Sequence, residues 1–144
     1  MNNTLRRSMI WPLLLLTLTC FVPSHAELVV VVGAGSTVST LSKEQLIDLY
    51  LRRLKDFPGS NDTATPLIYN SGPLRSEFLQ NVLGRSDAQV KAIWARYTFT
   101  GKAQAPRTVE NPEEVKQLLA AHPKMIGYLN RGDVDASVKV VLVP

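Results

Sequence analysis

Five consecutive apolar residues, Leu28 to Val32, constrain the fold of this chain more than any other stretch. Four of them are valine, whose β-branched side chain favours strands. An apolar run without alternation is typical of a strand that is buried on both faces, as in an α/β domain. The residues 33–35, Gly-Ala-Gly, follow at once, and Ser42 with Gln45 predicts a capping box at the start of a helix. The stretch therefore resembles the beginning of a glycine-rich phosphate loop, and that interpretation has to be tested first.

The glycines do not match the dinucleotide-binding fingerprint. That motif needs Gly-x-Gly-x-x-Gly directly at the start of a helix, where the helix N-terminus holds the phosphate. Val38 occupies the third glycine position, and the capping box places the helix start near Lys43, well beyond Gly35. The helix dipole would not act on a phosphate at these glycines. We therefore expect no nucleotide and no other cofactor here.

The segment before the strand has the pattern of a secretory signal peptide. Two arginines give a positive start, the run 9–22 is mostly apolar, and Ser24 and Ala26 place small residues before a cleavage site. A membrane span needs about 20 apolar residues, so this run is too short to be a stable membrane anchor. A lipoprotein is also disfavoured, because Thr19 rather than a small residue precedes Cys20. The sequence predicts a signal peptide over residues 1–26.

Cleavage after Ala26 leaves 118 of the 144 residues, enough for one domain with one core at residues 27–144. The only cysteine is lost with the signal peptide, so the mature chain has no disulfide. Small eukaryotic secreted domains are usually rich in disulfides, whereas cysteine-free exported domains are common in the bacterial periplasm. We therefore expect a periplasmic protein.

The mature chain is only mildly basic. Of the 16 Lys and Arg residues, two belong to the signal peptide, and the other 14 are set against 12 Asp and Glu, which gives a net charge of +2. This balance permits anion binding but does not require a nucleic-acid partner. The chain has no RNA-binding motif, no basic helix with interleaved aromatics and no internal repeat. Nucleic acid is therefore not an expected partner.

Strand and helix patterns alternate along the rest of the chain. Further strands are expected at 66–69, 125–129 and 138–143, and helices are expected to start after Ser42, near Pro73, after Ser86 or Asp87, and after Asn111. Glu114 is in place to complete a capping box with Asn111, and the residues 98–109, which show no periodicity, are expected to form a loop. The sequence predicts one α/β domain with a mixed β-sheet flanked by helices.

Several segments together resemble a known family. The residues 39–51, Ser-Thr-Leu-Ser-Lys-Glu-Gln-Leu-Ile-Asp-Leu-Tyr-Leu, are similar to the (S/T)-L-S-x-x-Q-L-x-x-I-F-L-G segment of PstS-like phosphate ABC transporter substrate-binding proteins, a branch of the class II periplasmic binding proteins. The residues 69–78 resemble the second anion loop of that family and the helix after it. Trp94 and the residues 99–102 resemble its aromatic helix and glycine-containing loop, and 123–129 resembles its P-G-A-I-G-Y-V segment.

The resemblance implies a periplasmic-binding-protein lobe in a short, single-lobe form, which acts as a non-enzymatic solute-binding protein. It implies phosphate or a similar small anion as the ligand and an ABC transporter permease as a partner. The anion-binding residues that it implies are Asn70, Ser71, Gly72, Arg75 and Ser76. Asn70 stands where the family has an arginine, and Leu74-Arg75-Ser76 replaces its Ser-Gly-Thr. Arg75 therefore restores a positive charge in a new place.

The physical chemistry of this loop leaves two interpretations open. Free N–H groups at a helix start attract anions, Ser71 and Ser76 add hydroxyls, and Arg75 adds a fork suited to phosphate or carboxylate. In the other interpretation, Ser71 caps the helix and Arg75 is a solvated side chain. Lys102 and Arg107 lie in a predicted loop and are candidates to line the same cleft. An open half-site should bind only in the millimolar range, near −4 kcal/mol, about half of what micromolar binding needs.

The chain shows no catalytic set and no metal-ligand spacing. His122 is the only histidine of the mature chain, and there is no thiol or Gly-x-Ser-x-Gly nucleophile. We therefore expect no enzyme, no catalytic residue and no metal. The alternative to solute binding is a protein-interaction or envelope accessory module that keeps the lobe fold but has lost the anion site.

Overall fold

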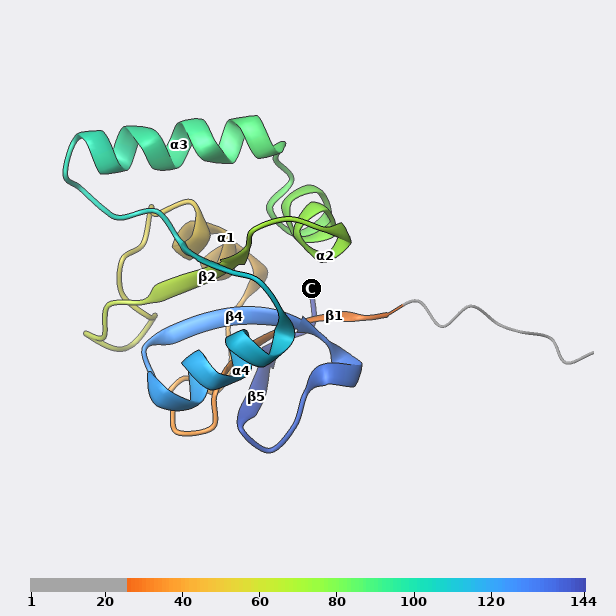
Figure 1. Ribbon diagram of the computed structural model, residues 1–144. Coiled ribbons are helices and arrows are strands. Elements are labelled where there is room, and N and C mark those ends of the chain that lie inside the picture. The colour runs from red at the N-terminus through yellow and green to blue at the C-terminus, as the bar shows by residue number, and fades with distance from the viewer. Residues whose placement is uncertain (1–25) are drawn as a thin grey trace, which may run out of the picture.

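A computed structural model describes residues 26–144 of the chain (Figure 1). The predicted signal peptide lies outside the described residues except for Ala26, and it stays a prediction. No helix within residues 26–144 is long and apolar enough to cross a membrane.

A five-stranded sheet in the order β3-β2-β4-β1-β5 forms the centre of the molecule. Its strands are β1 (Leu28–Gly33), β2 (Thr65–Tyr69), β3 (Arg107–Val109), β4 (Met125–Asn130) and β5 (Val138–Leu142). β2 runs parallel to both of its neighbours, β3 and β4, whereas β1 is antiparallel to β4 and β5. The expected mixed sheet is therefore confirmed, and the apolar run at 28–32 is its buried strand β1.

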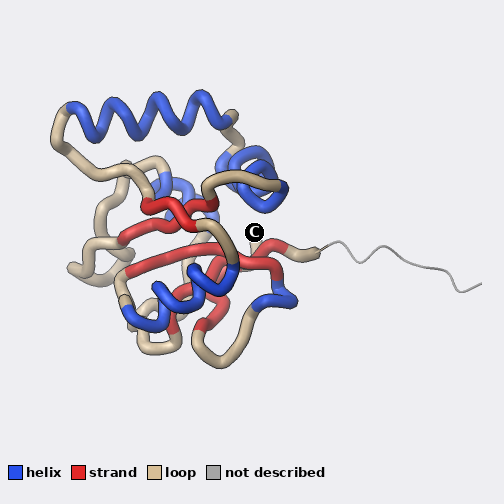
Figure 2. The backbone as a smooth tube through the Cα atoms, in the orientation of Figure 1, coloured by secondary structure: helices blue, strands red, loops and turns tan. Residues whose placement is uncertain are grey.

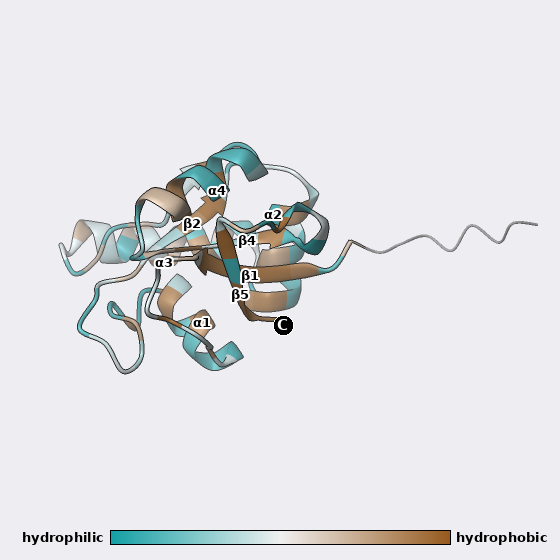
Figure 3. Ribbon diagram, turned by 90° about the horizontal axis from the view of Figure 1, so that it is seen from below, coloured by the Kyte–Doolittle hydropathy of each residue, from teal (hydrophilic) through white to brown (hydrophobic). Residues whose placement is uncertain are grey.

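Helices cover both faces of this sheet. They are α1 (Lys43–Tyr50), α2 (Pro73–Glu77), a π-helical turn η1 (Phe78–Leu83), α3 (Asp87–Phe99), α4 (Pro112–Ala121) and a 3-10 turn η2 (Arg131–Asp133). α4 lies on one side of the strands and α1 on the other (Figure 3). α3 lies at one end of the molecule and is joined to the rest by loops on both sides (Figure 2).

Aromatic rings fill the core between the sheet and α1. Tyr128 of β4 stacks on Phe78 of η1, with ring centroids 3.9 Å apart and planes 6° apart. Tyr50, at the end of α1, packs its edge against Phe78 at 4.6 Å and donates its hydroxyl hydrogen to the carbonyl oxygen of Leu67 at 2.8 Å. Burial raises the pKa of Tyr50 well above its usual range, so its hydroxyl stays a donor. This cluster ties α1, η1, β2 and β4 into one core.

Two glycines let α4 approach the other face of the sheet. A Cβ atom on Gly33 would overlap the carbonyl oxygen of Leu119, and a Cβ on Gly127 would lie 3.1 Å from Cγ1 of Val115. Gly33 is therefore a packing glycine at the end of β1. This explains why a glycine ends the buried strand here without a helix N-terminus beside it.

The structure corrects two expectations about the middle of the chain. The residues 98–109 were expected to be a loop, but α3 continues to Phe99, and Arg107–Val109 forms the parallel edge strand β3. β3 is too short to show a periodic pattern. At the start of α4, Asn111 accepts the N–H of Glu114 at 2.9 Å, as expected for a cap. The Glu114 carboxylate accepts the N–H of Glu110 at 2.7 Å instead of that of Asn111, so the second capping box does not form.

Candidate functional site

The loop that was expected to bind an anion follows the carboxyl end of β2. Because β3 and β4 run parallel to β2, the carboxyl ends of these three strands meet at one edge of the sheet. Ligands in open α/β sheets bind at the carboxyl ends of the strands. The five predicted residues therefore lie at the edge where this architecture places its ligand sites.

Glycine and proline set the geometry of the turn into α2. Gly72 is the N-cap residue with φ +96°, a left-handed conformation that side chains rarely adopt, and Pro73 occupies the first helical position. No side chain caps this helix, so the interpretation of Ser71 as a cap is wrong. An uncapped start leaves the N–H groups of the first helical turn without intrahelical acceptors.

Arg75 is held by two partners within the described residues. Its Nη1 donates to the carbonyl oxygen of Tyr69 at 2.7 Å, and its Nε and Nη2 both donate to Oδ1 of Asp87, with the Nε bond at 3.0 Å. Only 12% of the Arg75 side chain is exposed, so it is not the solvated side chain of the second interpretation. Asp87 also pairs with Lys91 at 2.6 Å, and the hydrogen bonds from Lys91 and Arg75 lower the pKa of its carboxyl.

The other predicted residues lie at the surface. The N–H of Asn70 donates to the carbonyl oxygen of Val109 at 2.8 Å, which extends the β2–β3 pairing, and the Asn70 side chain faces solvent. Ser71 is exposed, and the Ser76 hydroxyl is 3.4 Å from the carbonyl oxygen of Gly72. The structure therefore brings the five residues into one turn of chain. The hydroxyls of Ser71 and Ser76 lie at the surface, and the guanidinium of Arg75 is already paired with a carboxylate.

The surroundings of this turn are acidic. Glu110 and Glu113 follow β3, and Asp133 follows β4 at the same edge. Arg131, the cation of that last loop, pairs with Glu27. Burial, with a smaller contribution from Asp133, raises the pKa of Tyr69 to about 12. The binding of a small anion at this edge would therefore rely on backbone amides and hydroxyls. It would also require Arg75 to give up its bonds to Asp87.

The loop between α3 and β3 does not extend this site. Lys102 lines a pocket with Thr65 at the amino end of β2, opposite to the turn at Asn70. Arg107 begins β3, opposite Leu67. Lys102 therefore lies away from the carboxyl edge of the sheet, so it does not line the cleft that the sequence interpretation assigned to it.

Two aromatic residues near the site are buried, and one acid at the site was not expected from the sequence. Trp94 donates its Nε1 hydrogen to the carbonyl oxygen of Tyr50 at 2.8 Å and is buried, as its helical spacing indicated. Tyr128 is buried under Phe78. Asp87 was expected only as a helix cap, yet it is the main partner of Arg75, and no sequence pattern connects positions so far apart. Within residues 26–144 no group of three His, Cys, Asp or Glu residues could hold a metal.

The chain shares its fold with solved structures of phosphate-binding transport proteins. The chain is similar to an ABC-type phosphate transport receptor from Vibrio cholerae, with a TM-score of 0.62 and 18% identity over 80% of this chain and 45% of the receptor. A phosphate ABC transporter substrate-binding protein from Clostridium perfringens, solved with bound phosphate, gives a TM-score of 0.64 and 18% identity over 80% and 44%. PstS from Borrelia burgdorferi gives 0.55 and 16% over 80% and 46%.

These likenesses establish the fold. The chain spans less than half of the length of these solved structures. No protein-family model matches the sequence, and no curated protein is significantly similar to it. The three structures named above are transport receptors or substrate-binding proteins rather than enzymes. The expected fold is thus confirmed: residues 26–144 form an α/β domain with the fold of a lobe of phosphate ABC transporter substrate-binding proteins.

Proposed function

We propose that this chain is an exported, periplasmic solute-binding protein that binds phosphate or a similar small anion at the turn 70–76. The observation that carries the proposal is the position of this turn at the carboxyl edge of three parallel strands. The fold is shared with phosphate receptors, one of them solved with bound phosphate. Export would follow from the predicted signal peptide, and delivery to an ABC transporter permease would complete the role.

The pair of Arg75 and Asp87 controls the affinity in this proposal. A phosphate that bound here would compete with Asp87 for the Nε and Nη2 hydrogens of Arg75. Breaking such a charge-assisted contact costs about 1.5–3 kcal/mol, which is a large part of the roughly 4 kcal/mol that millimolar binding provides. The chain alone should therefore bind phosphate weakly, and neutralising Asp87 should tighten the binding.

The test is a calorimetric titration of residues 27–144 with phosphate at low salt. Asp87→Asn keeps the size of the side chain but removes its charge, so we expect the phosphate affinity to rise at least several-fold over the parent chain. Arg75→Ala should abolish the binding at the turn 70–76. Arg131→Ala removes a paired cation at the same edge and serves as the control that should change little. No binding by Asp87→Asn at millimolar phosphate would rule out the anion site.

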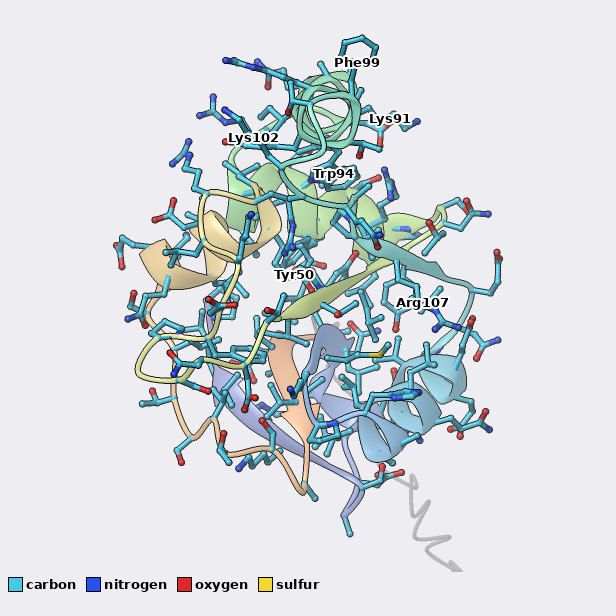
Figure 4. The ribbon with its side chains drawn as sticks, turned by 90° about the vertical axis from the view of Figure 1, so that its left-hand side faces the viewer. Tyr50, Lys91, Trp94, Phe99, Lys102 and Arg107 are labelled. Carbon is cyan, nitrogen blue, oxygen red and sulfur yellow. The ribbon has the colours of Figure 1, made fainter. Side chains whose placement is uncertain are left out.

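A second candidate function is a protein-interaction module, which α3 favours. Phe99, at the end of α3, is 94% exposed and points outward from the molecule (Figure 4). The segment 85–107 carries five Lys and Arg residues and only one carboxylate, Asp87. An exposed aromatic anchor with basic flanks fits an acidic protein surface that offers an apolar pocket.

A photoreactive residue in place of Phe99 tests this second candidate in the cell. It should crosslink to one acidic envelope protein, whereas the same residue in place of Gln117, exposed on α4, should not. Equal crosslinking from both positions would count against the module.

The genes beside this gene also distinguish the two candidate functions. Permease and ATPase genes would support uptake, and envelope-assembly or regulator genes would support the module.

A further inference from the structure

A basic pocket lies at the amino end of β2, away from the turn 70–76. Its volume is about 230 Å³. The loop after α1, the start of β2 and the loop after α3 form its walls, and its polar lining residues are Arg52, Lys55, Thr63, Thr65, Lys102 and Gln104. Figure 4 looks onto this side of the molecule, with Lys102 labelled beside the end of α3. We call this space the Arg52 pocket.

Arg52 is a buried cation without a carboxylate partner in the described part of the chain. The residue is only 7% exposed. Its Nη1 donates to two neutral carbonyl oxygens, of Leu49 at 3.3 Å and of Ala64 at 3.4 Å. Its Nε is enclosed and has no hydrogen-bond partner among residues 26–144. Burial lowers the pKa of the guanidinium, as expected for a charge that has lost water without gaining an opposite charge.

The backbone at Arg52 is also unusual. Its φ is +62°, and no other residue except glycine has a positive φ within residues 26–144. The position directly follows the C-cap Leu51 of α1, where glycine is the common choice. Gly101 occupies the same position after α3. A left-handed conformation costs a residue with a Cβ about 1–2 kcal/mol, so the chain bears strain at the one residue whose guanidinium lines this pocket.

The other groups of the pocket share the preference for an anion. Lys55 and Lys102 add two ammonium groups, and no carboxylate lines the pocket. The nearest acids in the sequence already have partners. Asp56 accepts the hydroxyl hydrogen of the lining residue Thr63 at 2.8 Å, and Asp62 pairs with Lys124 at 3.0 Å. Three cations around a partly buried space raise the local concentration of anions.

We propose that the Arg52 pocket binds a small oxyanion, such as phosphate, sulfate or the carboxylate of a small molecule. The guanidinium of Arg52, with Nη1 anchored on the carbonyls of Leu49 and Ala64, would donate hydrogens that these carbonyls leave free to the oxygens of the anion. Lys55 and Lys102 would complete the charge balance from the two loops. The volume is below the roughly 300–1,000 Å³ of sites for drug-sized ligands, so the ligand must be small.

The competing explanation is structural. Arg52 could serve only to hold the last turn of α1 and the carbonyl of Ala64 together, with solvent filling the pocket. If the pocket binds an anion, added anion changes the environment of Arg52 in a saturable way, and the change depends on Lys55 and Lys102. If Arg52 is only structural, added anion has no such effect.

The experiment uses residues 27–144 labelled with ¹⁵N and titrated separately with phosphate, sulfate and acetate at constant ionic strength. We expect saturable NMR shifts of the Arg52 Nε–Hε signal and of the backbone amides at 102–105. Arg52→Gly suits the positive φ and should keep the fold while abolishing these shifts. Lys102→Gln, in an exposed loop, should raise the dissociation constant about three- to tenfold, about one unit of log K or less.

The control is Arg96→Gln, which removes one positive charge from the exposed face of α3 outside the pocket. Its dissociation constant should equal that of the parent chain. Unchanged binding by Arg52→Gly or by Lys102→Gln would overturn the proposal, as would the absence of saturable shifts. If Arg52→Gly does not fold, Lys102→Gln decides alone. Shifts confined to residues 70–76 would place the anion at the other edge, so this test fails independently of the proposed function above.

Discussion

Two arginines at opposite ends of β2 solve the problem of a buried charge in different ways. Arg75, beyond the carboxyl end, binds the carboxylate of Asp87 and the carbonyl of Tyr69. Arg52, near the amino end, binds two carbonyl oxygens and no carboxylate. Arg75 is thus held in an ion pair with Asp87 that an external anion must break, whereas Arg52 has no carboxylate partner among the described residues. At the carboxyl edge, which the fold favours for ligands, the buried arginine already has a carboxylate partner. At the opposite edge, the buried arginine has none among the described residues.

The largest expected effect concerns the ion pair of Arg75 and Asp87. Asp87→Ala leaves the mostly buried Arg75 without its carboxylate, and we expect it to lower the free energy of unfolding by about 2 kcal/mol, below the 3–5 kcal/mol of fully buried pairs because Asp87 is half-exposed. Urea unfolding measures this change. Lys91→Ala removes the exposed partner of Asp87 and should cost less than about 0.5 kcal/mol. Equal losses from both variants would contradict the view that Arg75 is the dependent partner.

The next effect separates the backbone from the side chain at Arg52. Both Arg52→Ala and Arg52→Gly delete the guanidinium, but only alanine keeps the strain of φ +62°. We expect the glycine variant to be more stable than the alanine variant by about 1 kcal/mol. Thermal or urea unfolding of the two variants checks this order. A more stable alanine variant would mean that this backbone position is not left-handed in solution.

Lowering the pH should affect the stability contributions of the two arginines differently, because only Arg75 has a partner that can be protonated. Pairing lowers the pKa of Asp87 in the folded state, so the unfolded chain binds a proton more readily, and the pair stabilises the fold above the ordinary Asp pKa of about 3.9. This contribution is lost as the pH falls through the lower, folded-state pKa. The stability difference between the parent chain and Asp87→Asn should therefore shrink from about pH 5 to pH 3. The difference between the parent chain and Arg52→Gly should stay constant over the same range.

The smallest effect is expected at Arg53, the neighbour of Arg52. Arg53 pairs with Asp48 at 3.0 Å, but its side chain is 53% exposed. Exposed ion pairs contribute little because water and salt screen them, so Arg53→Ala should change the free energy of unfolding by less than about 0.5 kcal/mol. The same urea experiment measures it. A loss as large as that of Asp87→Ala would show that burial does not explain the difference in stability contribution between the ion pairs of Arg53 and Arg75.

The sequence was sufficient where local chemistry decides the structure. The capping box of Ser42 and Gln45 forms as expected, and the apolar run before it is a fully buried strand. Val90 and Trp94, at helical spacing, are the buried residues of α3. In each of these cases the signal lies within one turn of helix or one strand, and so it can be read without knowing the partners.

The sequence was insufficient where the partner is remote. β3 exists because three residues pair with β2, and the state of Arg75 depends on Asp87, a residue of the next helix. Arg52 carried a signal that the sequence reasoning missed. The family segment that residues 39–51 resemble ends in glycine, and Arg52 stands at that glycine position. A charged residue where a helix end usually has glycine points to a side chain that serves a purpose other than ending the helix.

The burial of Trp94 provides an optical probe of this molecule. In a chain that begins at Glu27, Trp94 is the only indole, and its Nε1 hydrogen is bound to the carbonyl oxygen of Tyr50. This bond joins α3 to the end of α1, two residues before Arg52. Tryptophan emission therefore reports, without any label, whether α3 stays seated on the domain. A partner that lifted α3, or an anion that tightened the loop after α1, would shift that emission in opposite directions.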